Sequence, residues 1–166
     1  LEYSVMAGVT RLTPILVIAT YQLFKENMEE CMPYAVAIEM VHNSSLIHDD
    51  LPGIDNDDFR HGKPTNHKQF NEATAILAGD ALQNKPYQII SQDLANTRLD
   101  KMPKKIRILQ EFAQATQKML AGQYVDTQKE GKNISAEELK YIHQNKTGAF
   151  LKLSVRMGAI LAEAPE

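Results

Sequence analysis

Apolar residues recur every three or four positions along most of this chain, and this spacing constrains the fold more than any other feature. A period of 3.6 residues places such side chains on one face of an α-helix, whereas a half-buried strand would need strict alternation. No segment has a convincing strand pattern, so we expect an all-α fold, with residues 1–166 as a single domain. The expected helices cover residues 3–24, 33–50, 70–94, 103–128, a short stretch opened by a capping box from Ser135 to Glu138, and 148–162.

Prolines bear on where these helices bend or end. Pro14 lies inside the first expected helix and should kink it, because proline lacks a backbone N–H and its ring crowds the preceding turn. Pro86 should likewise bend its helix or end it early. Pro52 and Gly53 should stop the second helix, and residues 53–69, rich in Asp, Asn, Gly and Pro, are typical of a long functional loop.

The composition excludes several classes of protein. The chain has 18 Lys and Arg against 21 Asp and Glu, a formal net charge of −3, whereas a nucleic-acid binder needs an excess of basic residues on one face. The longest purely apolar run, Ile15–Ala19, is far shorter than the roughly 20 residues of a membrane-spanning helix. Cys31 is the only cysteine and no segment resembles a secretory signal, so we expect a reducing, cytoplasmic setting.

Carboxylates crowd together where the second expected helix ends. Such crowding raises proton affinity unless a cation neutralises it, so a hard divalent ion is the natural partner. On an unbroken helix Asp49 and Asp55 would lie about 240° apart, but a break at Pro52 and Gly53 lets the chain turn back. Mg²⁺ suits such a cluster, because it takes one or two carboxylates and completes its shell with water and phosphate oxygens. The alternative is a solvated acidic loop. The five acids are Asp49, Asp50, Asp55, Asp57 and Asp58.

Basic side chains follow the acids in the same loop, at Arg60, Lys63, His67 and Lys68. Acids that hold a metal, followed by bases that hold anions, indicate a site for a diphosphate with Mg²⁺. Mixed charge in a solvated surface loop is the competing interpretation.

Four segments together resemble the trans-isoprenyl diphosphate synthases, the family of the farnesyl and geranylgeranyl diphosphate synthases. The run from Ser45 to His67 resembles the family's first aspartate-rich motif, and residues 77–82, Leu-Ala-Gly-Asp-Ala-Leu, resemble its next conserved helix. Residues 122–126, Gly-Gln-Tyr-Val-Asp, are similar to its Gly-Gln-x-x-Asp element, and residues 146–148 to its Lys-Thr-Gly. The resemblance spans residues 2–161, and the combination is highly specific.

The resemblance implies a bundle of long antiparallel helices around a deep central cavity. It also implies a Mg²⁺-dependent, short-chain trans-prenyl diphosphate synthase of isoprenoid biosynthesis. In this family an allylic diphosphate is bound through three Mg²⁺ ions between two aspartate-rich motifs. It ionises to an allylic carbocation and is attacked by the double bond of isopentenyl diphosphate. Family members are commonly homodimers, so we expect a homodimer here.

The resemblance assigns the metal and the allylic diphosphate to particular residues. Asp49 and Asp55 would ligate Mg²⁺, with Asp50 nearby. Arg60 and Lys146 would grip the allylic diphosphate. Preorganised cationic groups of this kind lower the barrier to C–O cleavage, because negative charge accumulates on the leaving diphosphate.

Further roles carried over from the family concern the reacting centre and the tail pocket. Gln123 and Asp126, three residues apart on one helical face, would support the reacting centre and the water shell of the metal. Thr147 would lie beside the developing cation. Ser44 and Ser45 occupy the positions where family members often place bulky side chains at the floor of the tail pocket. These small residues predict a deeper pocket and elongation beyond geranyl diphosphate.

The chain departs from the family at the expected isopentenyl diphosphate site. This site normally begins Gly-Gly-Lys-Arg-Leu-Arg-Pro, and Thr10 and Thr13 stand here in place of the Lys and the second Arg. His61 replaces a further arginine, which leaves Arg11 and His42. Each charged hydrogen bond to phosphate contributes about 1.5–3 kcal/mol, so these losses should weaken binding by orders of magnitude.

A second departure is the absence of another aspartate-rich motif before the chain ends at Glu166. We therefore expect a truncated chain that corresponds to the N-terminal and middle parts of a synthase. Two alternatives remain. One is a catalytically degenerate homologue or non-catalytic subunit, favoured by Thr10, Thr13 and His61. The other is a related terpene cyclase, whose usual signatures are largely absent.

Overall fold

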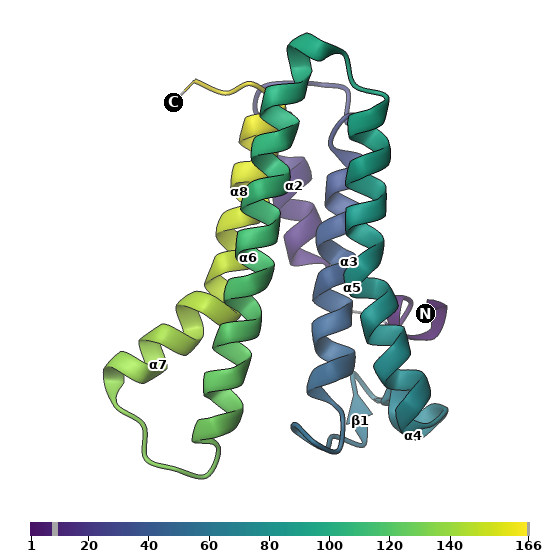
Figure 1. The fold of residues 1–166 in the computed structure, drawn as a ribbon, viewed down its shortest axis with the longest axis vertical. Helices are drawn as coiled ribbons and strands as arrows, with labels where there is room; N and C mark the ends of the chain where they lie inside the picture. Colours follow the sequence, from purple (N-terminus) through teal and green to yellow (C-terminus); the bar gives the residue numbers. More distant parts are fainter. Residues whose placement is uncertain (8–9, 166) are drawn as a thin grey trace.

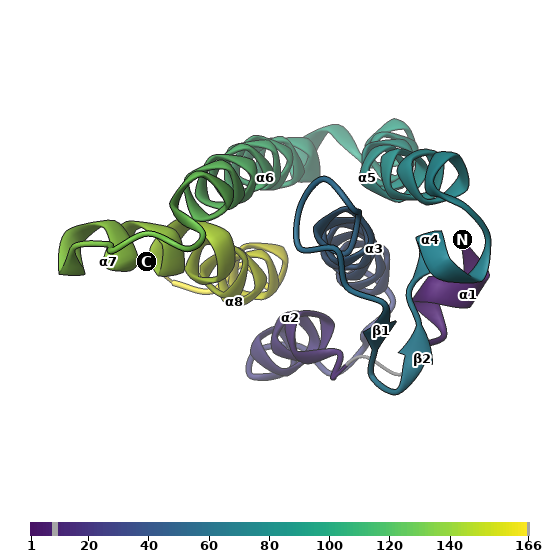
Figure 2. The ribbon, with the colours of Figure 1, turned by 90° about the horizontal axis from the view of Figure 1, so that it is seen from below.

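Antiparallel helices form the body of the computed structural model, which describes residues 1–7 and 10–165. Each long helix reverses the direction of the one before it (Figure 1). Helix α3 packs on α5 and α2, α2 packs on α8, and α8 packs on α6, so the helices follow one another around a ring (Figure 2). The expected all-α bundle is confirmed. The long helices are α2 (Leu12–Gln22), α3 (Met32–Asp49), α5 (Glu72–Ala95), α6 (Met102–Lys129) and α8 (Ala149–Leu161).

Short elements connect the long helices. Two strands of two residues each pair antiparallel between α3 and α4, so the expectation that no segment forms a strand is wrong here. Their pairing is too short to leave a periodic pattern in the sequence. The short elements are α1 (Glu2–Val5), β1 (Phe59–Arg60), β2 (Lys63–Pro64), α4 (Asn66–Gln69), the 3₁₀-helix η1 (Leu99–Lys101), α7 (Ala136–His143) and the π-turn η2 (Gln144–Gly148).

The expected single helix over residues 3–24 is wrong, because α1 and α2 are separate helices. Arg11, the residue before α2, has a left-handed backbone with φ of 50°. Pro14 therefore lies in the first turn of α2, where a backbone N–H has no partner within the helix, and it causes no kink. Residues 8–9, which also belong to that expected helix, lie outside the described residues.

Of the two outcomes expected at Pro86, a bend or an early end of the helix, the early end does not occur. Helix α5 continues for nine residues past Pro86 to Ala95. The proline ring is fully buried and lies one turn before the buried Ile90. Packing of this apolar face offsets the backbone hydrogen bond that proline cannot make.

Side-chain caps mark the starts of two helices, α5 and α7. The expected capping box is confirmed, since Ser135 Oγ accepts from the Glu138 backbone N–H at 3.2 Å and Glu138 Oε2 accepts from the Ser135 N–H at 2.9 Å. Asn71 Oδ1 caps α5 by accepting from the Thr74 N–H at 2.7 Å. These contacts fix where α7 and α5 begin.

The core lies along the inner faces of the long helices. Its largest fully buried side chains include Tyr34, Ile38, Ile90, Phe112 and Met157, which come from α3, α5, α6 and α8. A smaller cluster of Ile47, Ala75, Ala78 and Leu82 joins the other end of α3 to α5. Among the described residues, no helix is long and apolar enough to cross a membrane.

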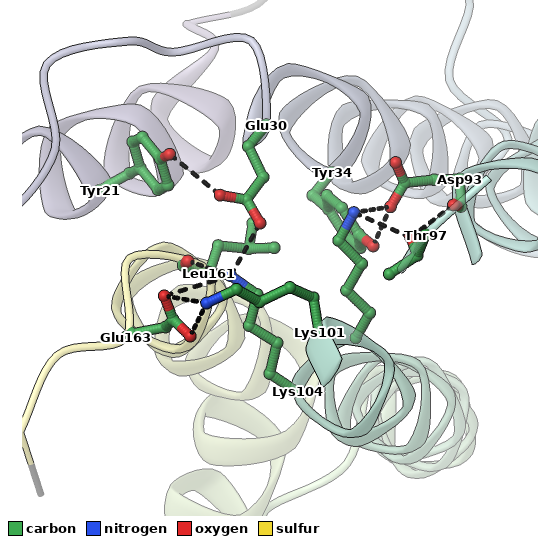
Figure 3. Close-up of polar contacts among 10 residues, drawn as sticks. Tyr21, Glu30, Tyr34, Asp93, Thr97, Lys101, Lys104, Leu161 and Glu163 are labelled. Carbon is green, nitrogen blue, oxygen red and sulfur yellow. Dashed lines mark hydrogen bonds and ion pairs between the residues drawn. The ribbon is translucent and has the colours of Figure 1, made fainter. Parts of the chain in front are cut away.

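A polar network closes the end of the bundle where α3 and α6 begin (Figure 3). Tyr34 Oη donates to Asp93 Oδ2 at 2.6 Å, and Lys105 Nζ lies 2.8 Å from the same oxygen. Lys105 also donates to Thr97 Oγ1 at 3.0 Å. Lys105 is only 7% exposed. Tyr34, Asp93 and Lys105 therefore link α3, α5 and α6 through a nearly buried charge.

The second half of the network ties α6 to α8. Lys104 Nζ lies 2.8 Å from Glu30 Oε1 and donates to the Leu161 carbonyl at 2.8 Å. Lys101 pairs with Glu163 at 2.7 Å (Figure 3). The ends of α3, α5, α6 and α8 are thereby linked at this closed end.

Candidate functional site

A cavity of about 410 Å³ lies within the ring of helices. Residues of α2, α3, α5, α6, η2 and α8 line it, and its apolar lining includes Leu46, Ile54, Met119 and Phe150. The central cavity expected for the fold is therefore present. Many of the residues singled out from the sequence also line it: Thr10, Thr13, His42, Ser44, Ser45, Asp49, Gln123, Lys146 and Thr147.

The end of α3 brings Asp49 and Asp55 together. After Asp50 the chain reverses, and the Asp55 N–H donates to the Asp49 carbonyl at 2.9 Å. The Ile54 N–H donates to the Leu51 carbonyl at 2.9 Å within the same turn. The expected reversal at Pro52 and Gly53 is confirmed, so two carboxylates that an unbroken helix would separate share one end of the bundle.

Asp49 carries a buried oxygen without a partner. Its Oδ1 makes no hydrogen bond to any described residue. Burial raises the pKa of Asp49, although the charges of Lys146 and Arg60 oppose this rise. Burial, and then the neighbouring Asp49, also raise the pKa of Asp55. A partly buried carboxylate beside a second carboxylate that repels it forms a favourable place for a cation.

Lys146 connects three elements at this position. Its Nζ lies 2.7 Å from Asp126 Oδ2 on α6 and 3.6 Å from Asp49 Oδ2 on α3. Burial lowers the pKa of Lys146, but the hydrogen bond to Asp126 and the charge of Asp49 outweigh burial and raise it. Lys146 is therefore held as a cation between two carboxylates.

The π-turn η2 sets the position of Lys146. A Cβ at Gly122 would lie 2.6 Å from the Lys146 backbone nitrogen and 3.1 Å from the carbonyl carbon of Asn145. Only glycine lets η2 approach α6 this closely. Single π-turns inside helices occur frequently at functional sites. Periodicity in the sequence did not indicate η2. The sequence feature related to its close approach to α6 is Gly122, the glycine of the Gly-Gln-x-x-Asp element.

Asp50 is engaged differently from Asp49. Arg60 Nε donates to both Asp50 oxygens, at 2.9 and 3.0 Å, and Arg60 Nη2 donates to Oδ1 at 2.6 Å. This hydrogen bonding raises the pKa of Arg60. The Asp50 side chain is 5% exposed, and no described residue bonds to Arg60 Nη1. Asp50 thus holds one edge of the guanidinium and leaves the other edge available.

The residues expected around an isopentenyl diphosphate lie apart. Thr10 and Thr13 line the cavity, and Thr13 Oγ1 is buried without a partner. Burial lowers the pKa of His42, which favours the neutral imidazole. Arg11 is exposed and donates to the Val5 carbonyl at 3.2 Å, and His61 is exposed in the turn between β1 and β2. Among the described residues that line the cavity, Lys146 is the only Lys or Arg.

Sequence reasoning missed two polar residues of the cavity, His48 and Gln83. His48 Nε2 lies 3.1 Å from the Ile76 carbonyl and 3.5 Å from Asp80 on α5. His48 follows Ser44 by four positions, so helical spacing from the predicted pocket residues could have found it. Gln83 comes from α5, and no local pattern indicates its contact with α3.

The carboxylates at the end of α3 fit a hard divalent cation as ligands. In the part of the chain that the structure describes, no three His, Cys, Asp or Glu side chains enclose a metal by themselves. Mg²⁺ does not require such a cage, because it usually binds one or two carboxylates together with water and phosphate oxygens. The unpartnered oxygen of Asp49 and the adjacent Asp55 match that preference.

The family model for polyprenyl synthetases matches residues 1–166. The chain belongs to the polyprenyl synthetase family. Two relatives of this chain are the farnesyl diphosphate synthase of Bacillus subtilis (strain 168), 43% identical over 166 residues, and the geranylgeranyl diphosphate synthase of Cyanophora paradoxa, 43% identical over 169 residues. The alignments cover 99% and 100% of this chain and 55% of each relative.

A solved structure agrees with this assignment. The crystal structure of a geranyltransferase from Legionella pneumophila superposes on this chain with a TM-score of 0.90 at 36% identity. The match covers 99% of this chain and 57% of that one. The chain therefore spans little more than half the length of the relatives it matches.

Proposed function

We propose that the whole protein is a short-chain trans-prenyl diphosphate synthase, which condenses an allylic diphosphate with isopentenyl diphosphate in isoprenoid biosynthesis. The observation that carries this proposal is that Asp49, Gln123, Lys146 and Thr147 line one cavity whose other walls are largely apolar. A ligand with a charged head and a hydrocarbon tail needs charged groups beside apolar lining. The relatives named as farnesyl and geranylgeranyl diphosphate synthases support this substrate class.

In this proposal Asp49 and Asp55 hold Mg²⁺, which supplies positive charge to a leaving diphosphate. Arg60 and Lys146 contact the allylic diphosphate directly. Asp50 orients Arg60, because both its oxygens accept from one edge of the guanidinium. A fixed cation stabilises the charge that develops during C–O cleavage without a further cost of reorganisation.

The other site residues act around the reacting atoms. Asp126 orients Lys146 through their 2.7 Å contact. Gln123 has a buried, unpartnered Nε2 that can donate to a substrate oxygen, and Thr147 lies beside the developing cation. Ser44 and Ser45 leave room for a longer hydrocarbon tail, so products extend beyond geranyl diphosphate.

The test is incubation of the full-length protein with labelled isopentenyl diphosphate, Mg²⁺, and dimethylallyl or geranyl diphosphate. We expect label in elongated prenyl diphosphates, resolved by chromatography. No incorporation of label overturns the synthase proposal. Geranyl diphosphate as the sole product overturns the role given to Ser44 and Ser45.

A second candidate is a homologue that binds an allylic diphosphate without elongating it. Thr10 and Thr13 favour this candidate, since both line the cavity and neither side chain is cationic. In that case the double variant Thr10→Lys, Thr13→Arg gains incorporation of labelled isopentenyl diphosphate. No gain in the double variant counts against this candidate, and a cyclic hydrocarbon product would indicate a terpene cyclase instead.

A homodimeric state and a cytoplasmic setting remain predictions.

A further inference from the structure

The N-terminal helix α1 is fastened to the hairpin that carries Arg60 and to α4, which follows the hairpin. Tyr3 Oη donates to the Pro64 carbonyl at 2.8 Å, and Asn66 Nδ2 donates to Ser4 Oγ at 2.8 Å. The Tyr3 ring also meets Phe70 edge to face, with centroids 5.4 Å apart. These contacts join residues about sixty positions apart in the sequence.

The hairpin depends on such contacts for its order. Each of its strands has two residues, in the register Phe59 opposite Pro64 and Arg60 opposite Lys63. A hairpin of this length is not stable by itself, and neither is a helix of four residues such as α1. The hairpin and α1 therefore stabilise each other, and Tyr3 bonds to the strand that pairs with that of Arg60.

The same helix faces the ion pair of Arg60 with Asp50 across a small cavity. Tyr3, Ser4, Asp50 and Arg60 all line one small cavity of about 30 Å³. This volume is less than a tenth of that of the central cavity. Little free space therefore separates α1 from the guanidinium of Arg60. A displacement of α1 would shift the hairpin through the Tyr3–Pro64 hydrogen bond, and Arg60 would move with the hairpin.

We propose that Tyr3 is a positioning residue, which holds the β1–β2 hairpin so that Arg60 presents its free Nη1 edge to a diphosphate. This inference rests on the proposed function, in which Arg60 contacts the diphosphate. Tyr3 does not touch the ligand. It acts through the Pro64 carbonyl and the strand pairing.

The experiment is a double-mutant cycle in the full-length protein, with inorganic pyrophosphate and Mg²⁺ as the probe in isothermal titration calorimetry. Tyr3→Phe removes one hydroxyl and keeps the ring on Phe70. We expect its Kd for pyrophosphate to rise about three- to tenfold, as for the loss of one hydrogen bond. Arg60→Lys keeps a cation beside Asp50 but loses the planar guanidinium, so this substitution alone should weaken the binding of pyrophosphate. In the Arg60→Lys background, Tyr3→Phe should change Kd by less than about twofold.

The matched control is Tyr141→Phe, which changes a tyrosine that is 44% exposed on α7 and should leave Kd unchanged. An equal loss of affinity from Tyr3→Phe in both backgrounds, or no loss in the wild-type background, overturns the positioning role. Unchanged binding in Arg60→Lys alone overturns the role of Arg60 in the proposed function, and this inference falls with it. Where Tyr3→Phe lowers the Tm below the assay temperature, all variants are titrated at a lower temperature at which Tyr3→Phe is folded, with the same expected results.

Discussion

Asp49 and Asp50 are neighbours in the sequence but meet different surroundings. Successive residues at the end of a helix point about 100° apart, so one side chain faces the central cavity and the other faces the hairpin. Asp49 keeps an oxygen without a partner, whereas both oxygens of Asp50 accept from Arg60. One carboxylate is thus available to a cation, and the other is already neutralised by the protein.

Asp49→Asn should separate binding from stability. We expect the affinity for pyrophosphate with Mg²⁺ to fall by about tenfold or more, because a charged contact is lost. The Tm should not fall, since burial disfavours the charged form of Asp49 in the folded state. Calorimetry and thermal unfolding of the same samples measure the two effects. Asp57→Asn, at an exposed position of the same loop, is the control and should change neither.

The candidate site could be predicted residue by residue only in part. The crowding of Asp49 and Asp55 near a Pro-Gly break was sufficient to predict that the chain turns back. The pairing of Asp50 with Arg60 was not predicted, because it depends on a hairpin whose strands are too short to show a pattern. The contact of Lys146 with Asp126 spans twenty residues and requires the tertiary fold.

At the scale of elements, the close packing of η2 on α6 controls where Lys146 lies. Gly122→Ala would place a methyl group against backbone atoms, which cannot move aside as a side chain can. We expect a loss of about 1–3 kcal/mol in the free energy of unfolding, measured by urea denaturation. Weaker pyrophosphate binding should accompany it. Gly53→Ala is the matched control for stability, because a Cβ there meets nothing within 4 Å, and equal losses in both variants would contradict the explanation.

The pairing of α6 with α8 should make stability depend on pH. Arg156 donates to both oxygens of Glu111 at 2.6 Å, and this hydrogen bonding lowers the pKa of Glu111 below its ordinary value of 4.5. The stabilisation is therefore complete above pH 4.5 and is lost as the pH falls through the lowered pKa.

Thermal unfolding between pH 7 and pH 3 tests this dependence with Glu111→Gln. The wild-type chain should have the higher Tm at pH 7, and the difference should shrink as the carboxyl becomes protonated. Glu26→Gln, at an exposed loop position, should show no such convergence. A Tm difference for Glu111→Gln that stays constant with pH would refute the ionic explanation.

Elements with a local cause could be predicted from the sequence, and those with a tertiary cause could not. The capping box at Ser135 and the end of α3 before Pro52 depend on neighbouring residues, and both are confirmed. The separation of α1 from α2 was missed because the apolar spacing continues across the break. The early end expected as one outcome at Pro86 does not occur, because the burial that offsets its missing hydrogen bond comes from other helices.

At the scale of the whole molecule, the two ends of the bundle differ in charge balance. At the closed end, acids and bases pair with one another, as Asp93 does with Lys105. At the end where α3 stops, carboxylates outnumber the cations near them, and Asp49 shares Lys146 with Asp126. The molecule is therefore closed by its own ion pairs at one end, and in the proposed function an external cation balances the charge at the other.

Asp93→Ala tests the closed end. It would leave the nearly buried Lys105 without its carboxylate, so we expect a loss of about 3 kcal/mol or more in the free energy of unfolding. Asp100→Ala removes an exposed ion pair with Arg98 and should have no measurable effect. Urea denaturation measures the free energy of unfolding of both variants. Similar losses in the two variants would contradict the claim that burial makes the Asp93–Lys105 pair important for stability.

The π-turn has a consequence for every residue after it. Helix α7, η2 and α8 run without interruption from Ala136 to Leu161, and their axis bends where they meet (Figure 1). Because each helical residue advances the chain by about 100°, the length of η2 sets the rotational phase of α8. Deleting a single residue there would swing Phe150, Leu153 and Met157 out of the interior together. The five-residue length of η2 therefore decides which face of α8 packs into the core and which face is exposed to solvent.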